Sequence, residues 1–190
     1  MKVDFRRFVN RALSYLNESK GFVFASFFIF VLSAILGFIF VERLSFFDAL
    51  LKGIFAQVEG LSGFRLIAFI FYNNVTSAFF GLFFGFFLGI FSFFNIMLNG
   101  ALVGYVLART SETQGFGLVW RLVPHGIFEL PAIFIATGLG MRLGATFFSH
   151  KWKKILKGRV LDSARVFLVV IVPLLIVAAV IEGLLITFSG

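Results

Sequence analysis

The sequence lacks cysteine and is poor in charge. Without cysteine the chain forms no disulfide, no thiolate metal site and no cysteine nucleophile. Only 14% of its 190 residues are charged and 60% are hydrophobic, whereas a soluble domain is typically about a quarter charged. This leaves too little polar surface to cover a soluble globule, so the composition indicates a protein embedded in a membrane.

Long apolar segments predict transmembrane helices. A helix rises 1.5 Å per residue, so about 20 apolar residues cross a hydrocarbon core of about 30 Å. Between Arg65 and Arg109 there are 43 residues without a charge, interrupted in the middle only by Ser92 and Asn95. One straight helix of that length would be about 65 Å long, so this run must turn back on itself. The five predicted spans are residues 21–41, 64–88, 92–109, 121–142 and 165–188.

Two further segments are amphipathic and too polar to span. Residues 3–16 place apolar side chains on one helical face and arginines elsewhere, and residues 45–62 repeat apolar side chains at helical spacing. We expect both to lie in the membrane interface. The predicted fold is therefore all-α: a polytopic membrane helix bundle of about five transmembrane helices with two interfacial amphipathic helices. Its parts are an interfacial helix over 1–20 and the bundle over 21–190.

The net charge of +8 belongs to the segments that flank the spans. Such residues meet anionic lipid headgroups, so we expect the lipid bilayer as a partner and no nucleic acid. The predicted headgroup contacts are Lys151, Trp152, Lys153, Lys154 and Lys157.

Charge also predicts the orientation of the chain, because lysine and arginine gather on the cytoplasmic side. Five of them lie in the first 20 residues and seven in 142–165, against three in 42–65 and two in 109–121. With five spans these segments alternate consistently. We therefore expect a multi-pass protein of the cell membrane, with its N-terminus in the cytoplasm and its C-terminus outside.

Glycines recur every four residues and predict close helix packing. Each set lines one helical face, where a small residue lets another backbone approach. Packing within one subunit is one interpretation, and a dimer face or a permeation path is the other. The glycines are Gly81, Gly85, Gly89, Gly100, Gly104, Gly140 and Gly144.

A few polar residues inside the spans are the candidate functional residues, since buried ionisable groups in membranes tend to mark function. Counting helical rise from the span ends places them at a similar depth in the outer half of the bilayer. This predicts one polar cluster facing the bundle interior. Its expected members are Asn73, Asn74, Asn99, His125, Glu129 and Glu182.

Three interpretations of this cluster stay open at this point. It acts as a hydrogen-bonded lock between helices, as a path for an ion or solute, or as a site for a divalent metal such as zinc. The metal ligands would be His125, Glu129 and Glu182, because imidazole and carboxylate oxygens suit such a cation. His125 and Glu129 stand four residues apart on one helical face, but the second histidine of a metalloprotease motif is missing.

The motifs resemble those of the stage II sporulation protein M family of bacterial and archaeal membrane proteins. The matching pieces are Asn73-Asn74, the glycines at 81, 85 and 89, Asn99-Gly100 with Gly104, Pro124-His125-Gly126 with Glu129, Val172-Pro173-Leu174-Leu175, Ala178-Ala179, Glu182 and Thr187. The resemblance implies a multi-span plasma-membrane protein. In spore-forming bacteria the namesake works with peptidoglycan-remodelling proteins during engulfment, and other members occur in organisms that form no spores.

These observations lead to one main functional hypothesis and two alternatives. The main one is a non-enzymatic membrane protein that scaffolds or assembles partners, as a homo-oligomer through its glycine faces, with membrane or cell-envelope proteins as further partners. The first alternative is a small transporter or channel that uses the intramembrane cluster. The second is an intramembrane metal-dependent enzyme.

Overall fold

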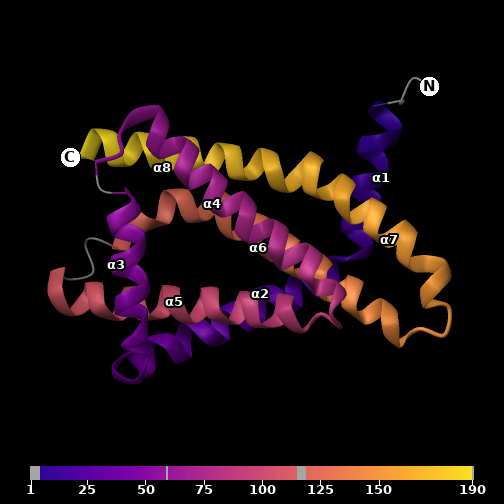
Figure 1. The fold of residues 1–190 in the computed structure, drawn as a ribbon, viewed down its shortest axis with the longest axis horizontal. Helices are drawn as coiled ribbons and strands as arrows, with labels where there is room; N and C mark the ends of the chain where they lie inside the picture. The colour runs from indigo at the N-terminus through magenta and orange to yellow at the C-terminus, as the bar shows by residue number, and fades with distance from the viewer. Residues whose placement is uncertain (1–4, 59, 115–118, 190) are drawn as a thin grey trace.

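The computed structural model describes residues 5–58, 60–114 and 119–189. Within the helices, the description leaves out the side chains of residues 54, 55, 58, 113, 114, 119–125 and 186–189. The long helices are α1 (Phe5–Glu18), α2 (Lys20–Ile39), α3 (Phe46–Val58), α4 (Gly63–Phe83), α5 (Ile90–Gln114), α6 (Val119–Ala145), α7 (Trp152–Val166) and α8 (Val172–Ser189) (Figure 1). The short elements are η1 (Val41–Leu44), η2 (Phe84–Phe86), η4 (Thr146–Phe148) and the π-helix η5 (Phe167–Ile171).

The predicted all-α membrane fold is confirmed. Among the described residues, five helical stretches are long and apolar enough to cross a membrane: Lys20–Ile39, Gly63–Phe86, Ile90–Glu112, Gly126–Phe148 and Trp152–Leu185. The uncharged run turns back after η2, where Leu88 and Gly89 adopt φ values of 56° and 75°. A leucine in this left-handed region is uncommon, so the turn depends on the packing around it.

The basic segment 142–165, expected to be a connection, is largely helical. It contains α7 except for its last residue, and α7 runs through η5 into α8. Pro173 has no backbone N–H, and in a regular α-helix its ring would crowd the carbonyl group of Val169. The wider turns of the π-helix η5 come just before it and leave room for the ring. The last helical stretch therefore combines a polar arm with the fifth span.

The connecting segments are distributed between the two ends of the bundle as the charge count predicts. At one end α1 packs against α7, where Arg11 contacts Asp162 at 3.0 Å. At the opposite end Arg109 of α5 contacts Glu42 of η1, also at 3.0 Å. The two strongly basic segments therefore share one end and the two weakly basic ones share the other. Which end faces the cytoplasm stays a prediction.

The two amphipathic segments form helices that run across the bundle. Figure 1 shows α1 and α3 at opposite ends of the molecule, each transverse to the long helices. Phe47 of α3 packs on Tyr105 of α5, with ring centroids 5.5 Å apart, while Phe5 and Leu13 of α1 remain exposed. This arrangement agrees with the predicted interfacial position, which would bury the exposed apolar side chains in lipid.

Helix α6 forms the centre of the bundle. Its spanning segment is 67% buried, whereas the other four are 22 to 33% buried. The main core cluster joins residues of α6 such as Ala136 and Leu139 to Leu82 of α4 and Leu175 of α8. Polar groups on α6 are consequently the ones that other helices surround.

Glycines let the backbones of neighbouring helices touch. A Cβ atom at Gly85 would overlap the backbone of Gly140, and one at Gly144 would overlap Gly89. Between α2 and α5, a Cβ atom at Gly100 would lie 2.5 Å from the carbonyl oxygen of Phe30. The predicted glycine faces are therefore occupied by helices of the same chain, and a dimer through these faces would require the bundle to open.

Candidate functional site

Three of the predicted polar residues meet between α4, α6 and α8. Glu129 of α6 makes a polar side-chain interaction with Asn74 of α4 and an electrostatic one with Glu182 of α8. Asn74 is 8% exposed, so the amide belongs to the bundle interior. The structure thus places two carboxyl groups and one amide, each from a different helix, in one polar cluster.

Close packing of α4 on α8 positions this cluster. Leu66 and Ile70 of α4 form an apolar cluster with Ala179 of α8. Gly183 follows Glu182 directly, and a Cβ atom at Gly183 would overlap the side chain of Ile67. Because both helices also pack on α6, residues at matching levels of the three helices come within reach of one another.

The other predicted members lie elsewhere or outside the described part of the chain. Asn73 is exposed, since neighbouring residues on a helix point in different directions. The side-chain amide of Asn99 donates to the backbone oxygen of Asn95 at 2.8 Å, and the two side chains lie 3.4 Å apart. The side chain of His125 is among those that the structure does not describe, although its backbone belongs to α6.

The metal site stays a prediction. Within the described residues, no three histidine, aspartate or glutamate side chains form a group able to hold a metal ion. The predicted set of His125, Glu129 and Glu182 is not tested by this finding, because it includes a side chain outside the description. What the structure adds is that Glu129 and Glu182 lie within electrostatic reach of each other.

Sequence reasoning did not place Asn95 among the candidate residues. Helices α4 and α5 diverge from their shared turn (Figure 1), and a groove of about 340 Å³ opens between them. Four exposed phenylalanines, Leu98 and Asn95 line this groove. Over the described residues, the Asn95 side-chain nitrogen has no hydrogen-bond partner. Asn95 interrupts an apolar run, and this sequence signal was available to identify it.

Comparison with known proteins identifies the family of this bundle. A family model described as stage II sporulation protein M matches residues 26–185. The chain belongs to this family. The match covers α3 to α7 and most of α2 and α8, including the polar cluster and the groove, whereas α1 lies before it. No curated protein and no solved structure matches the chain.

Proposed function

We propose that this member of the stage II sporulation protein M family is a non-enzymatic assembly protein. It holds a transmembrane helix of a partner in the groove between α4 and α5. The observation that carries this proposal is the Asn95 amide in an otherwise apolar groove that faces the lipid. The partner is a second copy or another membrane or cell-envelope protein, and the experiment below separates these.

Depth makes the Asn95 amide an effective binding group. Asn95 and Asn99 lie five and nine residues from the start of α5, which corresponds to about 8 and 14 Å along the helix. At that depth no water replaces a missing partner, so a polar group from a neighbouring helix is favoured. Such hydrogen bonds between transmembrane helices contribute about 0.6 to 2 kcal/mol. The phenylalanines around the amide supply the apolar contact area.

Site-specific photo-crosslinking in cells tests this proposal. A photoreactive amino acid replaces Phe94 in the groove, and in the control it replaces Phe28, which is exposed on α2. We expect a discrete protein adduct at Phe94 and none at Phe28. The adduct should weaken about 3- to 30-fold in Asn95→Leu, since leucine retains apolar volume and removes a hydrogen bond of about 0.6 to 2 kcal/mol.

The mass of the adduct identifies the partner. An adduct of twice the chain mass indicates a homo-oligomer, and another discrete mass indicates a different membrane protein. An adduct of undiminished yield in Asn95→Leu, or the absence of any adduct at Phe94, would contradict the proposal.

A transport function is the second candidate, supported by the two interacting carboxyl groups of Glu129 and Glu182 inside the bundle. Carboxyl groups in this position are typical of ion and proton paths. Because the chain has no cysteine, single cysteines at Glu129 and at the fully buried Ala136 report water access directly. Labelling of Glu129→Cys alone by a water-soluble thiol reagent would support a path. No labelling of either variant would support a structural lock.

We further infer that the end formed by α1 and α7 faces the cytoplasm. The inference rests on the positive-inside rule and on the contact that joins these two basic helices at one end. Reporter fusions at both termini test it. We expect a cytoplasmic reporter to be active at the N-terminus and inactive at the C-terminus, and the reverse result would refute this orientation.

A further inference from the structure

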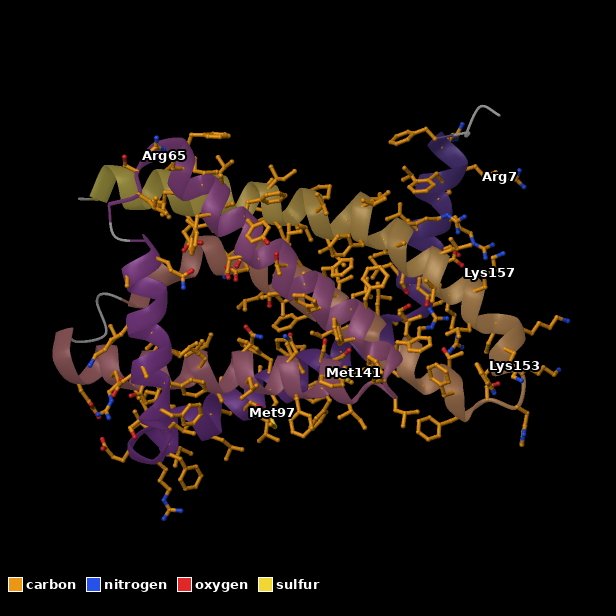
Figure 2. The ribbon with its side chains drawn as sticks, in the orientation of Figure 1. Arg7, Arg65, Met97, Met141, Lys153 and Lys157 are labelled. Carbon is orange, nitrogen blue, oxygen red and sulfur yellow. The ribbon has the colours of Figure 1, made fainter. Side chains whose placement is uncertain are left out.

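A pocket lined by arginines lies between α1 and α7, away from the groove and the intramembrane cluster. It has a volume of about 450 Å³ and opens to the surface at the basic end of the molecule. Its lining includes Arg7, Phe8, Arg11, Gly158, Asp162 and Arg165. Figure 2 shows Arg7 at the same end as Lys153 and Lys157, with Arg65 at the opposite end.

Asp162 holds two of the arginines in place. It is 4% exposed and accepts hydrogen bonds from the Nε and Nη2 atoms of Arg11 at 3.1 and 3.0 Å. Arg165 also pairs with Asp162, and its guanidinium group lies 5.7 Å from the centre of the Phe8 ring. A guanidinium group carries five N–H donors, so both arginines retain donors for another acceptor.

The charge in this pocket is strongly positive even with Asp162 included. Among the described residues that line the pocket, three arginines and one aspartate give a formal charge of +2. The fork of an arginine matches the oxygens of a phosphate group, and a partly buried position strengthens the interaction. The pocket is therefore built for an anion with several oxygens.

The depth of the pocket indicates where this anion comes from. The helical stretch Trp152–Leu185 has 34 residues and is about 51 Å long, or about 21 Å more than the hydrocarbon core. If its last 20 residues fill the core, Arg165 and Asp162 lie about 2 and 6 Å beyond the core edge. The headgroup layer occupies about 5 to 8 Å on each side. The pocket thus opens at the level of the lipid phosphates.

We propose that this pocket binds the phosphate of an anionic phospholipid headgroup. The lipid chains lie beside α8, and the phosphate lies against Arg7, Arg11 and Arg165. Because α1 supplies one wall and α7 the other, the bound lipid fastens the N-terminal helix to the arm of the fifth span. A free phosphate compound has the same headgroup chemistry, and the experiment distinguishes the two sources.

Gly158 provides a test that changes no charge. A Cβ atom at Gly158 would meet nothing within 4 Å, and Gly158 lines the pocket, so Gly158→Leu places an apolar side chain where the phosphate would bind. Gly21 is equally open and lies at the start of α2, so Gly21→Leu is the matched control. Arg7→Gln removes one charge inside the pocket. Lys154→Gln with Lys157→Gln removes two charges that the sequence predicts at the headgroups but that do not line the pocket, so this variant separates general attraction to anionic lipid from binding in the pocket.

The measurement is native mass spectrometry of the full chain released from mixed micelles with equal amounts of phosphatidylglycerol and phosphatidylcholine. We expect one phosphatidylglycerol to be retained preferentially by the native chain and by Gly21→Leu. Gly158→Leu should lose this preference, and Arg7→Gln should reduce it about fivefold, since one basic residue contributes about 1 kcal/mol at a membrane surface. The double lysine variant should keep it.

Three outcomes would overturn the proposal. Gly158→Leu retaining phosphatidylglycerol as the native chain does would exclude the pocket. A larger loss in the double lysine variant than in Gly158→Leu would show that surface charge alone selects the lipid. Displacement of the lipid by millimolar inorganic phosphate, which is then retained in its place, would identify a soluble phosphate compound as the ligand.

Discussion

Replacing Gly140 by alanine should loosen the centre of the bundle. Gly140 lies where α6 crosses the end of α4, and a Cβ atom there would overlap the carbonyl oxygen of Gly81 and the hydroxyl group of Ser92. Ser92 donates a hydrogen bond of 2.6 Å to that same carbonyl. The alanine methyl group therefore overlaps the backbone of α4 and disturbs one buried hydrogen bond at the same time.

Two destabilising contributions and one stabilising contribution determine the expected change in stability. Overpacking a core costs about 1 to 3 kcal/mol, and the weakened Ser92 hydrogen bond costs about 1 kcal/mol more. Alanine is a better helix former than glycine by about 1 kcal/mol, which offsets part of this loss. We expect Gly140→Ala to lower the free energy of unfolding by about 1 to 3 kcal/mol.

Gly126→Ala on the same helix is the control. A Cβ atom at Gly126 would meet the Leu130 side chain at 3.7 Å, an ordinary contact, so only the gain in helix propensity remains. Unfolding of both variants by sodium dodecyl sulfate in mixed micelles, followed by circular dichroism, measures the difference. Equal unfolding midpoints for the two variants would refute the argument that backbone contact at Gly140 holds these helices together.

Three further predictions concern the ends of the bundle. Tyr105→Phe removes the hydroxyl that donates to Asp48 at 2.5 Å. The amide hydrogens of α3 should then exchange faster, by an amount that corresponds to a loss of about 1 to 3 kcal/mol in the free energy of opening. Unchanged exchange would contradict this prediction. Burial raises the pKa of Tyr15 above its ordinary value of 10.0, so the stability that this group contributes is complete below pH 10 and is lost as the pH rises further. Alkaline denaturation should therefore begin at a higher pH in Tyr15→Phe, and identical profiles would rule out a contribution from this side chain. The guanidinium group of Arg142 lies 4.2 Å from the Tyr15 ring centre and donates hydrogen bonds to the Tyr15 carbonyl and to Ser19. Arg142→Leu should therefore lower the free energy of unfolding by about 2 kcal/mol and speed proteolysis between α1 and α2. Cleavage at the native rate would argue against a role of Arg142 in holding these two helices.

Local features of the sequence were sufficient to predict the number of spans and which connecting segments lie at the same end of the bundle. The apolar lengths alone predict five crossings, because hydrophobic length is compared with a fixed bilayer thickness. Arginine and lysine are numerous in 1–20 and 142–165 and few in 42–65 and 109–121. The structure places the first two segments at one end of the bundle and the last two at the other. The order of polar and glycine motifs also indicated the family that the comparison then showed.

Other features depend on contacts between distant residues. The turn at Leu88 and Gly89 has no polar residue to mark it, and packing of Gly89 against Met141 accompanies its position. Counting residues predicts a similar depth for Asn99 and Glu129, but the Asn99 amide donates to the neighbouring turn of α5, at Asn95. Depth along a helix follows from counting residues, whereas the direction in which a side chain points follows from how that helix is rotated.

The same distinction applies to the two surfaces that carry the proposals. The sequence shows an asparagine among phenylalanines and a set of basic residues in two segments far apart. Only the divergence of α4 from α5 exposes Asn95 in a groove, and only the contact of α1 with α7 places three arginines around Asp162. Composition alone determined that this chain is a membrane protein, because whether a segment enters lipid depends on the length and hydrophobicity of that segment itself. Tertiary packing determined which of its few polar groups face one another, because that depends on helix rotation and crossing, which the bilayer leaves free.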